Sequence, residues 1–183
     1  MAGCSRWLLT FNPKKVGALV QRADELGVPR ISSIFKYTLA STGCMAEGKA
    51  TARMKFLSST LGCPMDALRS AVRRVPQILG LSEENLRSKI EFLVNKVALE
   101  PDYILQRPVL LSLSLEKRLV PRHYVLQVLA VNGLIKNDVY FYRSVCLAED
   151  NFVARYIDRH ENAVPGLADA YAAVRAGKLP VQV

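Results

Sequence analysis

Apolar residues recur every three or four positions along most of this 183-residue sequence, which is the spacing of one face of an α-helix. Gly and Pro follow most of these stretches and mark the helix ends. No stretch of useful length alternates like a β-strand, so the pattern predicts an all-α fold. The predicted helices cover residues 12–26, 31–39, 50–61, 65–75, 83–97 and 103–106, with a long helix around Pro121 that ends near Gly133.

The predicted helix ends are evenly spaced. Gly27, Gly62 and Gly133 each end an apolar stripe, and Ala98 takes the place of glycine in the fourth. The intervals are 35, 36 and 35 residues. A period of this length in an all-helical pattern indicates a solenoid of helix pairs, in which each unit buries its apolar face against its neighbours. The alternative, an irregular helical bundle, does not require such even spacing.

Two stretches of the sequence, VPQILGLSEENLRSKIEFL and RPVLLSLSLEKRLVPRHYVL, share one pattern. Each predicts a short turn begun by proline, then a serine that caps a helix and a glutamate in its first turn. After one inserted residue, Lys89 faces Arg122. Pro121 must either kink the second helix or mark a second start. Five positions share an offset of 32 residues: Pro76, Leu79, Leu81, Ser82 and Glu84 match Pro108, Leu111, Leu113, Ser114 and Glu116.

These stretches, extended to RRVPQILGLSEENLRSKIEFLVN and RPVLLSLSLEKRLVPRHYVLQVL, resemble the plant-type mitochondrial transcription termination factor (mTERF) family. The closing FVARYI and VPGLADAY are also similar, and a weaker likeness starts at WLLTFNPKKVGALVQRADELGVP. The resemblance implies a right-handed superhelical α-solenoid with two helices and a short third in each repeat. It further implies a basic concave side that binds nucleic acid, and a location in the mitochondrion or chloroplast. The chain resembles the C-terminal part of a member.

The predicted organisation is an array followed by a cap. Residues 1–145 would form about four mTERF-type repeats of roughly 35 residues each. After Asp138 the pattern loosens, and residues 146–183 are expected to form C-terminal capping helices that close the core.

The net charge of +9 is concentrated in the first part of the chain. Residues 1–75 carry +8, residues 76–145 carry +2 and residues 146–183 carry −1. Such an excess favours polyanions, nucleic acid above all. No apolar run approaches the roughly 18 to 20 residues of a membrane span. The first residues, MAGCSRWLLTF, form neither a convincing signal peptide nor an Arg/Ser-rich amphipathic leader, so they predict no targeting to a compartment.

The candidate nucleic-acid contacts are basic residues at recurring positions, because neutralisation of the phosphate backbone supplies most of the affinity. The alternative for each is a solvated helix face that binds nothing. Arg73 and Arg74 precede the first turn, Arg107 precedes the second, Lys89 and Arg122 are equivalent, and Lys117 and Arg118 occur in the second copy only.

Other reactive or aromatic residues suggest no further site. His123 is expected to be structural or at the surface, and Tyr140, Phe141 and Tyr142 are expected in the core rather than stacked on bases. The cysteines form no CxxC pair, so we expect reduced, mostly buried thiols and no zinc site: Cys4, Cys44, Cys63 and Cys146.

The sequence contains no HExxH, GxSxG, Walker or dinucleotide motif, so we expect no enzyme, no cofactor and no small-molecule substrate. The first hypothesis is a regulator of organellar gene expression that binds double-stranded DNA or RNA, in transcription termination or RNA processing. Other organellar expression proteins would be its partners. The alternative is a helical-repeat scaffold that binds another protein and makes no contact with nucleic acid.

Overall fold

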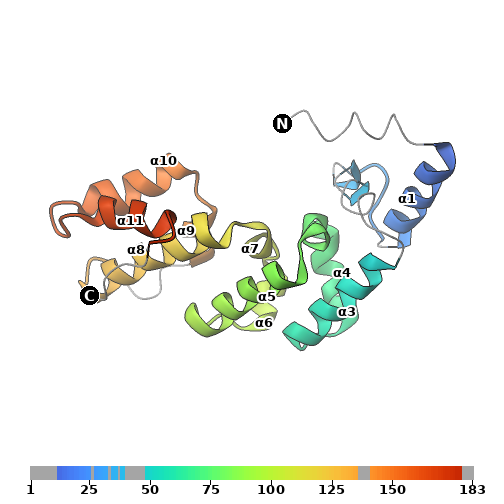
Figure 1. The fold of residues 1–183 in the computed structure, drawn as a ribbon, viewed down its shortest axis with the longest axis horizontal. Coiled ribbons are helices and arrows are strands. Elements are labelled where there is room, and N and C mark those ends of the chain that lie inside the picture. The colour runs from blue at the N-terminus through green and yellow to red at the C-terminus, as the bar shows by residue number, and fades with distance from the viewer. Residues whose placement is uncertain are drawn as a thin grey trace. The chain divides into compact units, whose positions relative to one another are not determined.

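The computed structural model confirms the all-α prediction for the part of the chain that it describes (Figure 1). Every element there is helical, and none of these helices is long and apolar enough to cross a membrane. The chain divides into two compact units, residues 1–112 and 113–183, called unit 1 and unit 2 below. The described residues are 12–25, 27–32, 34–36, 38–39, 48–135 and 141–178.

Unit 1 begins with α1 (Pro13–Glu25), as the apolar stripe predicts. Leu19 and Ala23 of α1 are buried with Leu39, and Val20 packs against them. Only the second half of the predicted helix 31–39 is helical: residues 35–36 and 38–39 are in a helix, whereas residues 31, 32 and 34 form turns or a bend. Its predicted end at Ser41 to Gly43 lies outside the described residues.

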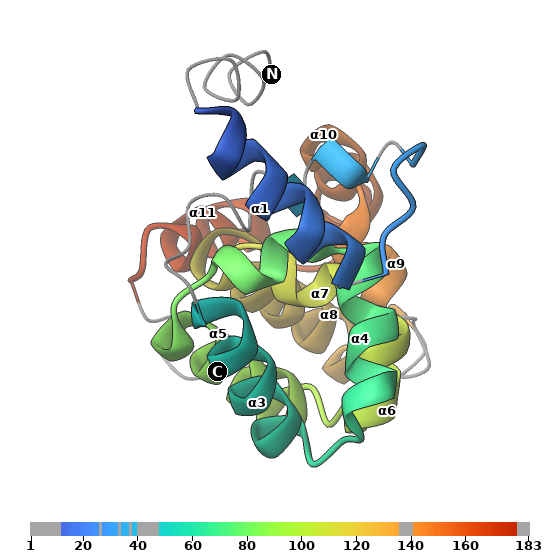
Figure 2. The same ribbon diagram turned by 90° about the vertical axis from the view of Figure 1, so that its right-hand side faces the viewer.

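The next helices form repeated units of two helices with a short one between them. The first such repeat, formed by α4, η2 and α5, lies wholly in unit 1, and the second begins there with α6 and α7. Figure 2 shows α3 near α5 and α4 near α6. The second copy continues in unit 2. The elements are α3 (Lys49–Leu61), α4 (Met65–Arg74), the 3-10 helix η2 (Pro76–Gly80), α5 (Glu83–Glu91) with the π turn η3 (Phe92–Lys96), α6 (Pro101–Gln106) and α7 (Val109–Ser112).

The short helices form as the sequence pattern predicts. Leu79 of η2 and its equivalent Leu111 of α7 are both buried. The side chains of Ser82 and Ser114 each accept a hydrogen bond from the backbone three residues ahead, at 3.2 Å. Both serines are therefore the N-caps that the sequence predicts.

The four predicted helix ends all adopt a left-handed backbone. Their φ angles are 69° at Gly27, 63° at Gly62, 58° at Ala98 and 68° at Gly133. At Gly62, the following N–H, that of Cys63, bonds the carbonyl of Ser58 at 3.1 Å and so completes the last turn. Ala98 is the one non-glycine residue with a positive φ among those described, so it carries backbone strain that glycine avoids.

Pro121 lies near the start of α8 (Val120–Val131), in a helix that continues without a break from a π turn, η4 (Leu115–Leu119). The N–H of Leu119 reaches back five residues to the carbonyl of Ser114, at 3.0 Å. The residue inserted in the second copy falls within this π turn. The wider turn rearranges the backbone bonding just before proline, where a regular helix would have to lose a bond.

Unit 2 continues through short helices to a final longer one. Phe152, Tyr156, Leu167 and Tyr171 are buried in its core, and α11 packs against α8. The predicted boundary at 145/146 falls inside α9. The elements are α9 (Phe141–Cys146), α10 (Glu149–Phe152), the π turn η5 (Val153–Ile157), the 3-10 helix η6 (Asp158–His160) and α11 (Leu167–Arg175).

Candidate nucleic-acid interface

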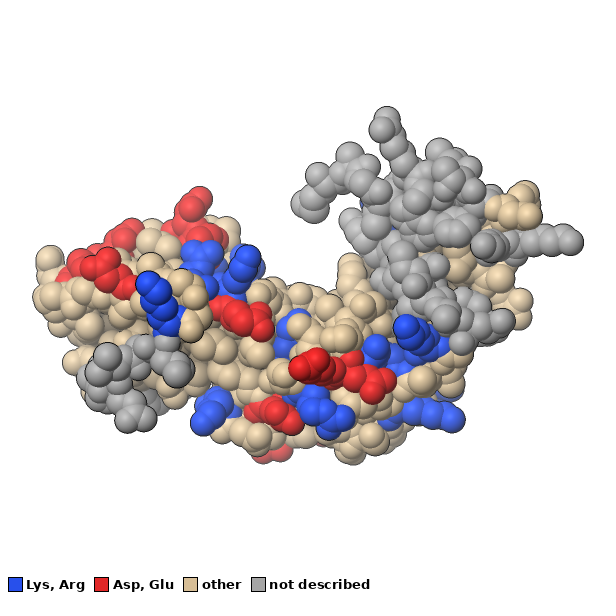
Figure 3. All heavy atoms as spheres, viewed as in Figure 1, with Lys and Arg blue, Asp and Glu red and all other residues tan. Residues whose placement is uncertain are grey.

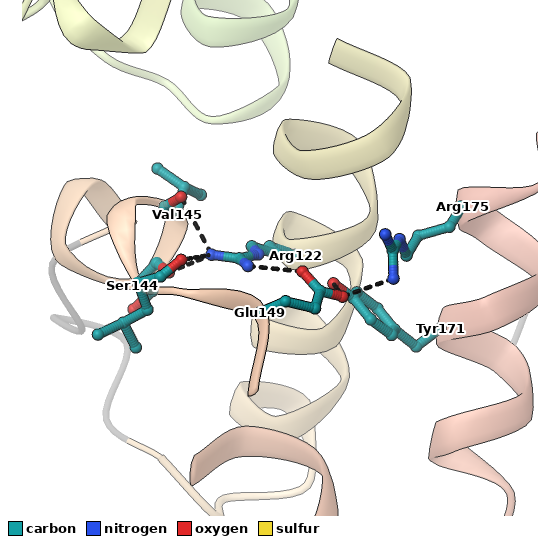
Figure 4. Close-up of polar contacts among 7 residues, drawn as sticks. Arg122, Ser144, Val145, Glu149, Tyr171 and Arg175 are labelled. Atoms are coloured by element: carbon teal, nitrogen blue, oxygen red, sulfur yellow. Dashed lines mark hydrogen bonds and ion pairs between the residues drawn. The ribbon is translucent and has the colours of Figure 1, made fainter. Parts of the chain in front are cut away.

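Arg122 of α8 is fully buried, with 0% of its surface exposed. Its Nη1 donates to the carbonyls of Ser144 and Val145, each at 3.1 Å, and of Leu147 at 2.7 Å (Figure 4). These carbonyls belong to the end of α9, where the last turn leaves carbonyls without helical partners. Arg122 therefore caps α9 from the neighbouring helix.

The other end of the Arg122 guanidinium meets Glu149, the first residue of α10. Nη2 of Arg122 lies 2.8 Å from Oε2 of Glu149, and Oε1 accepts from the Tyr171 hydroxyl at 2.9 Å and from Arg175 Nη1 at 2.5 Å. Figure 4 shows this carboxylate between α8 and α11. The guanidinium also lies over the ring of Phe152, 4.4 Å from its centroid.

Glu149 stays ionised because of these partners. Burial by itself raises the pKa of this carboxyl. The hydrogen bonds from Arg122 and Tyr171 and the charges of Arg175 and Arg122 outweigh burial, so the pKa of Glu149 lies below its ordinary value. A carboxylate paired with the buried arginine thus holds α8, α10 and α11 together.

Lys89 of α5 has the same role in unit 1. Its exposed fraction is 3%, and Nζ donates to the carbonyl of Leu111, in α7, at 3.0 Å. The separation along the chain is 22 residues, as it is from Arg122 to Ser144. The sequence predicts that Lys89 and Arg122 meet a phosphate backbone, whereas in this structure both cations are buried and donate to carbonyls.

Arg74 is exposed, although its guanidinium is also fixed. Nη1 donates to the carbonyl of Gln106 at 2.8 Å and Nη2 to that of Leu105 at 2.7 Å, at the end of α6. Nε lies 3.3 Å from the carbonyl of Ser70 in its own helix. Peptide carbonyls carry no net charge, so these contacts fix the position of the Arg74 guanidinium and leave its charge unbalanced by a carboxylate.

Arg73 and Arg107 lie close to Arg74. Arg73 is exposed in the last turn of α4, and its guanidinium packs over Gly27, where a Cβ would collide with it. Arg107 follows the last residue of α6, half-buried, with its Cζ 4.0 Å from the centroid of the Tyr103 ring. Arg74 binds carbonyls at the end of α6, so it lies beside Arg107, and Arg73 precedes it in the last turn of α4. We call these three residues the α4–α6 basic edge.

In unit 2, Lys117 is exposed and Arg118 is half-buried, both in η4. Arg118 lies near the end of α9, since its charge acts on the Cys146 thiol. Burial raises the pKa of that thiol, whereas a hydrogen bond with Tyr142 and the charges of Arg118 and Arg122 lower it, and burial prevails. Lys117 and Arg118 remain predicted contacts.

The basic surface is local rather than continuous on the face that Figure 3 shows. There the blue Lys and Arg side chains of the described residues alternate with red Asp and Glu side chains in both units. The described residues include no group of three potential metal ligands. Cys63 and Cys146 are free thiols.

The aromatic candidates of unit 2 pack within the protein where they are described. Phe141 is buried and Tyr142 is half-buried. The His123 ring meets Phe141 edge-on, with 5.8 Å between centroids, so His123 is a structural residue. Tyr140 lies outside the described residues.

The recurrence of two helices with a short helix between them defines a helical-repeat protein. The model of the mTERF family matches residues 10–149, and the chain belongs to that family, whose fold is a helical-repeat solenoid. Members are generally non-enzymatic, nucleic-acid-binding regulators of organellar gene expression. No curated protein and no solved structure matches the chain.

Proposed function

We propose that this protein binds double-stranded DNA or RNA and regulates organellar gene expression, at transcription termination or RNA processing, in the mitochondrion or chloroplast. The observation that carries the proposal is the α4–α6 basic edge. Arg74 is exposed there and held by neutral carbonyls, with Arg73 and Arg107 beside it. Lys117 and Arg118 would supply further contacts from unit 2.

The geometry of this edge suits a phosphate backbone. Arg74 is fixed by the fold, so binding costs little side-chain entropy, and a guanidinium donates several N–H groups in one plane. Basic residues that neutralise phosphates release counterions, which gives affinity that falls with salt. Because phosphate contacts carry little sequence information, this edge would position the nucleic acid rather than read it.

A salt titration of binding to duplex DNA and to RNA tests the proposal. We expect affinity at low ionic strength that falls as salt rises, and a double variant, Arg73→Gln with Arg107→Gln, that reduces the salt slope by about 1 for each lost contact. The matched control is Arg159→Gln with Lys178→Gln, two exposed cations of unit 2.

Two outcomes would contradict parts of the proposal, and a third measurement checks that the variants keep the fold. Equal losses in both pairs would mean that net charge, not this edge, governs binding. Lack of affinity for both nucleic acids at low salt would reject the function and favour the protein-binding scaffold. A change in the circular dichroism melting curve would show that a variant has altered the fold.

A further inference from the structure

Arg53 of α3 occupies the repeat position that Lys89 occupies in α5. Each lies nine residues before the left-handed residue that ends its helix, Gly62 or Ala98. The residues that follow are buried in both helices, Met54 in one and Ile90 in the other. In addition, α3 packs against η2 as α5 packs against α7. The series of inward-facing cations therefore includes Arg53 as well as Lys89 and Arg122.

Arg53 departs from this series in its partners. Lys89 and Arg122 donate to carbonyls, whereas Nε and Nη1 of Arg53 are buried and have no hydrogen-bond partner. Only 12% of the Arg53 side chain is exposed. A buried charged donor gains free energy when it meets an acceptor, so these N–H groups favour an anion at this position.

Glu83, the first residue of α5, covers this guanidinium weakly. Its Oε1 lies 3.4 Å from Nη1 of Arg53, too far for a good charged hydrogen bond, and 55% of its side chain is exposed. A side chain so exposed can turn into solvent at little cost. The Glu83 carboxylate therefore binds the Arg53 guanidinium only weakly, and another anion could take its position.

A second guanidinium lies at the same contact between α3 and α5. Arg87 follows Glu83 by one helical turn, and its Cζ lies 5.1 Å from the centroid of the Phe56 ring of α3. Lys49, one turn before Arg53 on α3, is exposed. Arg53 and Arg87 thus lie at the contact between α3 and α5, with Glu83 as a weakly held carboxylate, on different helices from the α4–α6 basic edge.

We propose that Arg53 binds a phosphate group of the nucleic acid, which displaces the carboxylate of Glu83, with Arg87 supplying a second positive charge. The proposal rests on the proposed function for the source of the phosphate. Phosphate oxygens accept from several N–H groups at once, so they satisfy both donors of Arg53 that lack a partner. A position that is structural at Lys89 and Arg122 is then a ligand site at Arg53.

The first test compares two neighbouring glutamates. Glu83→Gln and Glu84→Gln each remove one negative charge from the first turn of α5, but only Glu83 contacts Arg53. We expect Glu83→Gln to tighten duplex DNA binding at low salt by about fivefold more than Glu84→Gln. The difference should vanish in an Arg53→Met background. Equal effects of the two variants overturn the proposal.

The second test uses inorganic phosphate and needs no nucleic acid. At constant ionic strength, phosphate should raise the melting temperature of the wild-type protein relative to chloride, and the rise should be smaller in Arg53→Met, where only the general stabilisation by phosphate remains. Lys55→Met, an exposed position on the same helix, is the control and should keep the full rise. A rise as large in Arg53→Met as in Lys55→Met overturns the assignment.

The two tests separate this inference from the proposed function. Salt-dependent nucleic-acid binding with equal effects of Glu83→Gln and Glu84→Gln rejects the role of Arg53 and leaves the proposed function standing. A phosphate response that depends on Arg53, in a protein without affinity for DNA or RNA, supports the anion site and rejects the proposed function.

Discussion

Lys89 and Arg122 each send a buried positive charge to a backbone carbonyl 22 residues further along the chain. In both cases the acceptor belongs to a short helix of four to six residues, Val109–Ser112 or Phe141–Cys146. Such helices have few internal hydrogen bonds, because most of their carbonyls belong to the last turn. The recurring cation thus stabilises the short helix that its repeat packs against.

Arg122→Met should destabilise unit 2 by about 3 to 5 kcal/mol, because it leaves three carbonyls and a carboxylate without their donor. Urea denaturation, monitored by far-ultraviolet circular dichroism, measures the change in the free energy of unfolding. Lys117→Met, at an exposed site in the preceding turn, should change stability by less than about 0.5 kcal/mol. A loss below about 1 kcal/mol for Arg122→Met would contradict the role assigned to its contacts.

Ala98→Gly should stabilise unit 1 by about 1 kcal/mol, since Ala98 holds a left-handed backbone at φ 58°. The converse change, Gly62→Ala, should destabilise by a similar amount at φ 63°. Gly17→Ala is the control, because Gly17 lies inside α1 with open space around it and should become more stable. Thermal melts report all three, and the same sign for both Gly→Ala variants would refute the backbone argument.

The N-cap residues of the helices predict a substitution that stabilises unit 2. Ser82→Ala and Ser114→Ala should each cost about 1 kcal/mol, through loss of the side-chain hydrogen bond to the first turn. Ala148 caps α10 with an extended backbone (ψ 157°) and no side-chain bond. Ala148→Ser should therefore stabilise by about 0.5 to 1 kcal/mol in a urea titration. Ala148→Gly serves as a comparison, and an equal gain there would discount the hydroxyl.

The stability of unit 2 should decrease in acid because of Glu149. The pKa of this carboxyl is lowered on folding, so its contribution is complete above the usual glutamate pKa of about 4.3 and is lost as pH falls through the lower folded value. Melting temperatures measured from pH 7 to pH 3 should show this decrease. Glu149→Gln should flatten the profile. A profile unchanged by Glu149→Gln would assign the acid sensitivity elsewhere.

The elements of this fold follow from local rules. Apolar periodicity predicts the helices, and the residues Gly27, Gly62, Ala98 and Gly133 predict where they end, as the backbone angles confirm. The π turns do not follow from such rules. The insertion between the two copies marks one of them, but helical spacing alone does not distinguish an extra residue in a wider turn from a longer helix.

The sequence predicts Lys89 and Arg122 as contacts to nucleic acid, yet the structure buries both side chains. Repetition of Lys89 and Arg122 favours a repeated task, but it does not say whether the task is binding or folding. For Arg122, the spacing indicates burial. Leu119 and Val125 lie three residues before and after it, on the face that the structure buries. Its partner Glu149 could not be found in this way, since it lies in another helix.

A contact between a side chain and the main chain constrains only one of its two residues. Leu111, Ser144 and Val145 supply carbonyl oxygens, and nearly any amino acid at those positions would supply the same atom. The interaction can therefore persist while the sequence around it diverges. Correlated substitution between positions would not reveal it, because substitution at the acceptor position calls for no compensating change in the cation.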